Sequence, residues 1–421
     1  SARWLPTWNV SGAWNAHEES WFEKLKPVLS NFTAKLSYSL TADRGPSSIT
    51  NSRAVIKADN PWRPSASDKE SSLYIAWLAN NDLTYEKKHE LNFGIDAGFL
   101  NNRINFTFDI YTRRNYDLIG ATNTMGIGGE PTKYGNVAKM KSNGVELSLN
   151  TVNIKTKDFT WTTDFIYSHM HNEVTELNTY NRLYDYISGY GFTMPGYPQR
   201  SLFSIPFAGL NNEGLPTFYD PDGNITVTGI DMQEYDPERL KFLKYEGPAD
   251  PTDVGSLGNI FRYKNLTLNL FITYSFGNVV RLDPVFSSEY SDLSATPKEF
   301  NNRWIKPGDE KFTNIPVIAS RQQLNNLAYL SRAYQSYNYS TARVAKGDFI
   351  RMKEISLAYE FPKTLTQPLH LSNLSLKLQA TNLFLLYADK KVNGQDPEFF
   401  NAGGVATPMP KQFTLTLKFG I

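Results

Sequence analysis

Between residues 104 and 110 the chain reads Ile104-Asn105-Phe106-Thr107-Phe108-Asp109-Ile110, with apolar side chains at even positions and polar ones at odd positions. Successive side chains of a β-strand point to opposite faces, so this stretch has one apolar and one polar face. The same period of two runs through 32–40, 91–99, 266–276 and 412–421. The sequence therefore predicts an all-β fold built from amphipathic strands.

Such strands fit two architectures. In an antiparallel sandwich the apolar faces meet in a dry interior, whereas in a membrane barrel they face lipid and the polar faces line a lumen. The 421 residues include 24 Tyr, 26 Phe and 8 Trp, yet the mean hydropathy is only −0.43. A barrel needs apolar residues only at alternate positions, so its average hydropathy stays low. Composition therefore favours the barrel.

The lengths of the connections also favour the barrel. Strands are predicted near 4–16, 29–42, 88–100, 103–117, 140–153, 158–171, 199–210, 215–220, 253–263, 265–277, 347–361, 372–386 and 410–421. Short links alternate with long ones, the long ones being 43–87, 118–139, 172–198, 221–252, 278–346 and 387–409. Short periplasmic turns and long extracellular loops are typical of a transmembrane antiparallel β-barrel.

The number of predicted strands is odd. In an antiparallel sheet of thirteen strands the first and last strands run in the same direction, so the sheet cannot close on itself. An open edge in lipid leaves backbone groups unpaired, at a cost of several kcal/mol each. We therefore expect this chain to need a partner segment that carries further strands.

Five motifs resemble one family. They are Arg3-Trp4-Leu5-Pro6 leading to Trp14 and Glu18-Glu19; Gly94-Ile95-Asp96 leading to Asn101-Asn102-Arg103; Asn143-Gly144-Val145-Glu146-Leu147; Gly347-Asp348-Phe349-Ile350-Arg351-Met352-Lys353; and Asn382-Leu383-Phe384 followed by Asp396-Pro397-Glu398. Their identity and order resemble the C-terminal half of the SusC/RagA-like TonB-dependent outer-membrane transporters.

The resemblance implies a bacterial outer-membrane protein with a 22-strand barrel, of which residues 1–421 are the C-terminal portion with about 13 strands. The plug domain and the first strands would lie outside this chain. It also implies TonB-dependent import of a bulky nutrient, an oligosaccharide or a peptide. The implied partners are a SusD-like surface lipoprotein that closes as a lid and TonB acting through the plug, with a dimer of transporter–lipoprotein pairs also allowed. A passive porin and a non-transporting outer-membrane barrel remain alternatives.

Other classes of function find little support. Lys plus Arg number 43 and Asp plus Glu 42, so no charge excess indicates nucleic acid. There are no cysteines, which excludes disulfides and thiolate metal sites, and no apolar run is long enough for a transmembrane helix. No cofactor and no enzymatic activity is expected.

Residues that resemble chemical sites have simpler interpretations. The carboxylates predicted on the lumenal face are Asp96, Asp109, Glu146 and Asp164. His169 and His171 would share a strand face, but the sequence offers no third metal ligand nearby. No metal site and no catalytic residue is therefore predicted.

Substrate contacts are expected in the external loops 43–87, 172–198, 278–346 and 387–409. Aromatic faces bind the apolar faces of sugars and peptide side chains. The candidate substrate-binding residues are Trp62, Trp77, Tyr190, Tyr197, Tyr334 and Tyr337.

Overall fold

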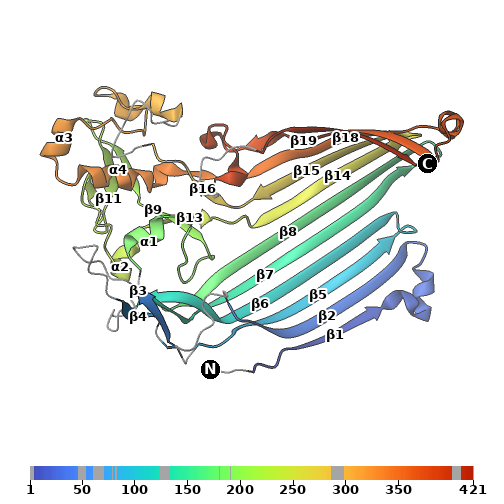
Figure 1. Ribbon diagram of the computed structural model, residues 1–421, viewed down its shortest axis with the longest axis horizontal. Helices are drawn as coiled ribbons and strands as arrows, with labels where there is room; N and C mark the ends of the chain where they lie inside the picture. Colours follow the sequence, from blue (N-terminus) through green and yellow to red (C-terminus); the bar gives the residue numbers. More distant parts are fainter. Residues whose placement is uncertain are drawn as a thin grey trace.

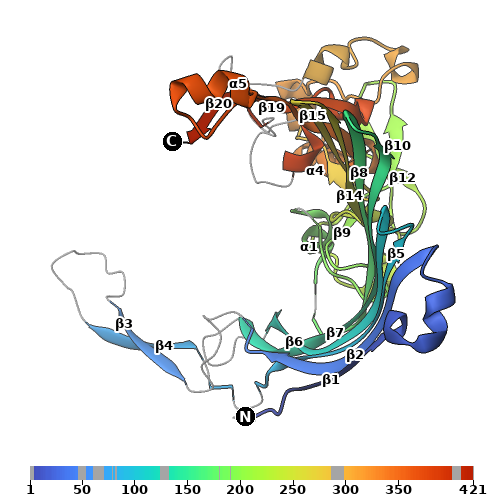
Figure 2. The ribbon, with the colours of Figure 1, turned by 90° about the vertical axis from the view of Figure 1, so that its right-hand side faces the viewer.

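A computed structural model describes residues 4–45, 54–59, 71–77, 79–80, 83–123, 132–179, 181–189, 191–285, 298–400 and 409–420. Eleven strands form one antiparallel sheet, and within the sheet they lie side by side in the order in which they occur in the chain. The sheet curves into an open arc, with β1 and β20 at its two edges (Figure 2). Its strands are β1 (Trp8–Asn15), β2 (Leu29–Asp43), β5 (Glu86–Phe99), β6 (Ile104–Asn123), β7 (Thr132–Lys155), β8 (Phe159–Leu177), β14 (Asp253–Tyr263), β15 (Leu266–Phe276), β18 (Phe349–Glu360), β19 (Asn373–Ala388) and β20 (Gln412–Gly420).

The two ends of the sheet differ in their connections. At one end lie the short links 16–28, 100–103, 156–158, 264–265 and 361–372. The other end carries 44–85, 178–252, 277–348 and 389–411, and there β6 and β7 form the longest hairpin of the sheet. Both β1 and β20 run toward the end with the short links (Figure 1). This arrangement confirms the alternation of connections and the common direction of the first and last strands.

Two of the thirteen predicted barrel strands are wrong. Segments 199–210 and 215–220 form β9 (Ser201–Ser204), β10 (Phe207–Leu210) and β11 (Pro216–Tyr219), which belong to small separate sheets. All four residues of β9 are buried, so this strand packs inside a globular core. A barrel strand instead keeps one face against lipid. The predicted loops 172–198 and 221–252 are consequently parts of a single connection, and the strand count stays odd at eleven.

The apolar side chains of the sheet are not covered by other parts of the described chain. Leu36 is 54% exposed, Leu378 53% and Leu415 68%. The buried apolar clusters of the described residues gather instead around the long connections. A soluble protein rarely exposes so large an apolar area, whereas lipid covers it in a membrane barrel. The prediction that the apolar face points outward is confirmed, and a dry sandwich interior is not formed.

The long connections fold into a globular unit at one end of the sheet (Figure 1). We call this unit the external cap and define it as the described residues of 181–252, 279–346 and 389–400. It contains α1 (Leu183–Ile187), β9, β10, β11, β12 (Ile225–Thr226), α2 (Pro237–Leu240), β13 (Lys244–Pro248), β16 (Val279–Arg281), α3 (Arg321–Asn326), α4 (Leu330–Asn338) and β17 (Val344–Lys346). The hairpin of β3 (Val55–Asp59) and β4 (Ser72–Trp77) stands apart from it (Figure 2), and α5 (Lys363–Thr366) lies between β18 and β19. None of the helices in the described ranges has the length and apolarity needed to cross a membrane.

Candidate functional site: the lumenal wall and the external cap

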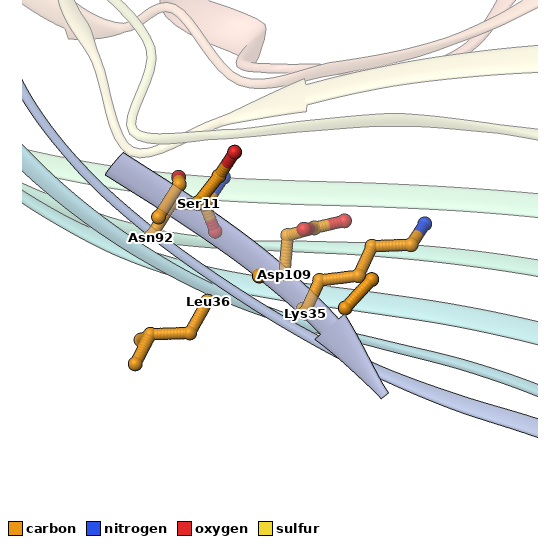
Figure 3. A pocket seen from close by; sticks show the side chains of 9 residues that line it. Ser11, Lys35, Leu36, Asn92 and Asp109 are labelled. Atoms are coloured by element: carbon orange, nitrogen blue, oxygen red, sulfur yellow. The ribbon is translucent and has the colours of Figure 1, made fainter. Parts of the chain in front are cut away.

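The concave face of the sheet, called here the lumenal face, carries polar side chains. Asn92 of β5, Asp109 of β6 and Lys35 of β2 point to this side, whereas Leu36 points the opposite way (Figure 3). Together with Ser11 and their neighbours they line a hollow of about 350 Å³. The alternation of side chains along a strand produces this arrangement, since Leu36 directly follows Lys35.

Ion pairs and amide contacts organise the lumenal wall. Lys35 pairs with Asp96. Glu90 accepts hydrogen bonds from Arg113 at 3.0 Å, and Lys88 lies 2.9 Å from the same carboxylate. Further round the arc, Glu354 accepts hydrogen bonds from amide nitrogens of the neighbouring strands β15 and β19, at 3.3 and 3.0 Å. The wall is therefore a mixed surface of paired charges and amides, suited to a hydrated polar solute.

The predicted lumenal carboxylates share this face. Asp109 and Glu146 are direct register partners on β6 and β7, and Asp96 pairs with Lys35. Asp164 accepts a hydrogen bond from Asn150 Nδ2 at 2.5 Å. Within the described ranges no three His, Asp or Glu side chains come together as a metal-binding group. These carboxylates therefore contribute the negative charges of the mixed lumenal wall.

His169 and His171 lie on the outward face. In register they stand opposite Val145 and Asn143 of β7, and Val145 belongs to the apolar outer surface. The Nδ1 atom of His169 lies 2.8 Å from Asp253 Oδ1, and Tyr167 donates its hydroxyl to the same carboxylate oxygen at 2.6 Å. The pair belongs to a polar and aromatic rim of the outer surface, where barrels place their interfacial side chains.

The predicted stacking role of Tyr334 and Tyr337 does not fit this structure. Both side chains are 1% exposed and lie in the main core of the external cap. The Tyr334 hydroxyl donates to the Val317 carbonyl at 2.6 Å, and Tyr337 packs edge-on against Phe207 at 5.6 Å between ring centroids. Burial raises the pKa of Tyr337 to about 12. Both tyrosines therefore hold the cap together and offer no face to a ligand.

Of the other four candidates, Tyr197 and Trp77 lie within the described residues and Trp62 and Tyr190 do not. Tyr197 is partly buried and packs against Phe203 and Tyr245, with ring centroids 5.2 and 4.7 Å away, so it too serves the core of the cap. The backbone of Trp77 pairs with Val55 in the β3–β4 hairpin. Trp62 and Tyr190 lie outside the described residues, so their role in substrate binding stays a prediction.

A buried ion pair fastens the cap to the barrel. Arg351 of β18 donates to Asp396 Oδ1 at 2.5 Å, and the two side chains are only 4% and 2% exposed. Glu398 adds a second carboxylate 3.1 Å from the same guanidinium nitrogen. We call these three residues the clamp. A buried guanidinium is stable only when opposite charge and hydrogen bonds surround it, so the clamp ties residues 389–400 to the sheet.

A small apolar cluster and three further polar contacts surround the clamp. Val280, Leu282, Ala345, Val392 and Phe400 pack together where the connections 277–348 and 389–411 meet. Gln395 Nε2 donates to Asp283 Oδ2 at 2.9 Å, which ties the connection 389–411 to 277–348. Arg343 pairs with Glu299 at 2.5 Å and donates to the Asp283 carbonyl at 2.5 Å. These contacts join the described parts of the connections 277–348 and 389–411.

A hollow of about 650 Å³ opens beside the clamp. It lies where β19 ends and the connection 389–411 begins. Its lining consists of Leu385, Leu386, Tyr387, Ala388, Asp389, Lys390, Val392, Gly394 and Gln395. This hollow combines apolar side chains with the charged side chains of Asp389 and Lys390.

Sequence reasoning missed the clamp, although both of its halves were in view. Arg351 and Asp396 each belong to a motif quoted above, yet they are separated by 45 residues. Both motifs hold further charged residues, Asp348 and Lys353 in the first and Glu398 in the second, so the sequence did not single out Arg351 and Asp396. Their pairing with each other was not predicted.

Comparisons with known proteins agree with this architecture. The chain is 25% identical over 409 residues to the TonB-dependent receptor P3 of Formosa agariphila, covering 92% of this chain and 37% of that protein. It is 26% identical over 433 residues to the TonB-dependent receptor SusC of Bacteroides thetaiotaomicron, covering 99% and 40%. The solved structure of the RagAB peptide importer in the open–open state matches with a TM-score of 0.75 at 23% identity, covering 99% of this chain and 42% of that one. No family model matches the chain. The chain spans about two fifths of the length of these curated relatives.

Proposed function

Since the chain is SusC/RagA-like over nearly its whole length and is an outer-membrane β-barrel, we propose that it forms the C-terminal part of a TonB-dependent importer for a bulky nutrient. The observation that carries this proposal is the pairing of an outward apolar face with a polar lumenal wall, beneath a folded cap at one end. The outward face fits lipid, the wall fits a hydrated solute, and the cap fits a recognition surface at the mouth.

The open sheet supports the division of the barrel. In the described residues β1 and β20 are edges that pair on one side only. Unpaired edges are not stable in hydrocarbon, so further strands must complete the barrel in the membrane. We propose that these strands and a plug domain stand outside residues 1–421, and that TonB acts on the plug from the periplasm.

A SusD-like lipoprotein is the proposed partner at the external end. The hollow beside the clamp and the rigid cap offer it a preformed surface, and little ordering is needed for docking because the clamp already fixes this connection. The substrate is an oligosaccharide or a peptide. The mixed charge of the lumenal wall accommodates either of them.

Energised transport is tested by uptake. Cells that carry the complete receptor are given fluorescent oligosaccharides and fluorescent peptides, with TonB present or deleted and with the proton-motive force intact or collapsed. We expect one of the two solute classes to accumulate, and only in energised cells with TonB. Uptake that persists without TonB would identify a passive porin, and failure of both classes to accumulate would identify a non-transporting barrel.

Lid docking is tested by site-specific cross-linking. The chain has no cysteine, so a single introduced cysteine is unique within it. Lys390→Cys lies in the hollow beside the clamp, and Lys157→Cys lies in a short turn at the opposite end of the sheet. We expect a surface lipoprotein to cross-link to the first variant and not to the second. Equal labelling of both positions, or of neither, would refute docking at this hollow.

A further inference from the structure

The outward face changes character in steps toward the external end. Register places Leu36, Phe93, Ile110 and Val145 in one row across four strands. The next row toward the cap holds Tyr38, Leu91, Thr112 and Asn143, and the row after it holds Leu40, His89, Arg114 and Lys141. Directly opposed side chains in an antiparallel sheet lie on the same face, about 4.5–5.5 Å apart at Cβ. The three rows therefore pass from hydrocarbon-like to polar to charged.

The transition between these rows marks the upper boundary of the membrane. Tyr38 and Tyr116 flank His89, each with a ring-centroid distance of 5.7 Å and an interplanar angle of 15°. Their hydroxyls lie 3.1 and 3.3 Å from its two ring nitrogens. Aromatic residues of this kind form the girdle where a barrel meets the lipid headgroups. The charged row therefore lies at headgroup level.

A groove of about 330 Å³ lies on the apolar side of this boundary. Its outward-facing lining comes from Leu36, Leu91, Phe93, Ile110 and Val145, with His169 opposite Val145 and with Thr112 and Asn143 toward the charged row. Tyr111 and Gly144 complete the lining. They are register partners whose Cβ positions face the lumen, so they contribute the floor of the groove. A Cβ atom on Gly144 would lie 2.5 Å from Tyr111 Oη, so the missing side chain lets the tyrosine ring lie flat against the strand. An apolar trough that ends in polar groups has the shape and chemistry of an acyl-chain site.

One cation stands uncompensated next to the groove. Lys141 pairs with Glu173 at 2.9 Å, and Lys87 pairs with Asp117 at 2.5 Å. Arg114, between them on β6, is exposed and forms no ion pair or hydrogen bond with any residue in the described part of the chain. It stands one row above Thr112, at the polar end of the groove. Guanidinium groups bind phosphate through two parallel hydrogen bonds, so Arg114 is placed to receive an anionic headgroup.

We propose that this groove and Arg114 form a binding site for a phosphate-bearing acylated lipid of the surrounding leaflet. The acyl chain lies along Leu91, Phe93, Ile110 and Val145, and the phosphate binds Arg114. The site faces away from the lumen and has no part in the proposed import path. It would fix the depth and rotation of the barrel in the outer leaflet.

The test measures lipid binding to the complete receptor in detergent by native mass spectrometry. Phosphatidic acid and diacylglycerol are compared, because they differ only by the phosphate. Inorganic phosphate alone is the competitor that distinguishes a lipid headgroup from the free ion. We expect phosphatidic acid to bind at least about tenfold more tightly than diacylglycerol, as one charge-assisted contact worth ~1.4 kcal/mol requires.

Two variants and one control locate the site. Arg114→Gln removes the charge of an exposed side chain that forms no ion pair or hydrogen bond with the described residues, and it should remove the tenfold preference for phosphatidic acid. Thr112→Trp fills the polar end of the groove with a residue that membrane interfaces tolerate, and it should weaken both lipids. Arg262→Gln changes the same residue type on β14, where register places it on the lumenal face opposite Thr267 and away from the groove, and it should leave lipid binding unchanged.

The outcomes are distinct. Equal binding of phosphatidic acid by the wild type and Arg114→Gln would overturn the proposal, and so would displacement of the lipid by inorganic phosphate alone. Unaltered binding in Thr112→Trp would overturn the role of the groove. Barrel folding in each variant is checked by heat-modifiable migration on a gel. If the receptor binds the lipid normally but imports neither class of solute, the proposed function is refuted and the lipid site is not.

Discussion

Replacing Asp396 by alanine removes one half of the clamp and leaves Arg351 buried beside a single remaining carboxylate. Removing one partner of a buried ion pair costs ~3–5 kcal/mol. Glu398 lies 3.1 Å from the guanidinium and its side chain is 40% exposed, so it offsets part of the loss. We therefore expect an effect near the lower end of that range. The connection 389–411 should detach locally while the barrel strands stay paired.

Hydrogen exchange followed by mass spectrometry on the complete receptor measures this detachment. A loss of ~3 kcal/mol in local stability corresponds to exchange about a hundredfold faster in residues 389–400, with β7 and β8 unchanged. Glu398→Gln is the matched control, because a half-exposed pair contributes only ~0–1 kcal/mol. The double variant Arg351→Met with Asp396→Leu should be less destabilised than Asp396→Ala, since neither charge remains buried alone. Unchanged exchange in Asp396→Ala, or strictly additive effects in the double variant, would refute the clamp.

Three further predictions follow from the cap and the barrel wall. Burial raises the pKa of Tyr337 from 10.0 to about 12, so between these pH values the folded cap keeps a proton that the unfolded chain releases. The stability of the cap should therefore be full below pH 10 and fall as the pH rises toward 12. Tyr337→Phe should flatten this pH dependence in fluorescence-monitored unfolding. Tyr337→Ala should unfold the cap at a cost of ~3–5 kcal/mol while the barrel keeps its heat-modifiable migration, and simultaneous loss of both would contradict the separation of the two cores. Gly144→Ala should destabilise the barrel by ~1–3 kcal/mol. Adding Tyr111→Ala should restore only part of this stability, because the His169 carbonyl also lies 2.6 Å from the new Cβ atom. Full restoration would contradict this and show that the clash with the tyrosine is the whole cause.

The barrel strands were predictable because their signal is local. Residues Ile104–Ile110 alternate between apolar and polar because one face of the strand meets lipid and the other meets the lumen. This difference is visible in consecutive residues. Eleven of the thirteen predicted strands belong to the large sheet, and the direction of the first and last strands followed from counting alone. The two errors, at 199–210 and 215–220, occurred where short strands are buried within a globular core and the period of two no longer reports on lipid.

The candidate site was predicted less well. The lumenal position of Asp109 follows from alternation, but the role of Tyr334 and Tyr337 does not follow from their place in a long connection. Aromatic residues in a loop bind a ligand only if they are exposed, and exposure depends on segments more than a hundred residues away. Phe207, which packs against Tyr337, lies 130 positions earlier in the chain.

The sequence by itself determined a membrane barrel with an apolar outer face, a polar lumenal face and its long connections at one end. Each of these features depends on the pattern of residues that are neighbours in the chain. Only the tertiary structure decided that the described residues of 181–252, 279–346 and 389–400 form the external cap and that Arg351 meets Asp396. It also decided that Arg114 lies beside an apolar groove with no ion-pair partner among the described residues. Those contacts join residues that are distant in the chain or lie on adjacent strands. Their free energy depends on burial and geometry, which no local pattern of residues records.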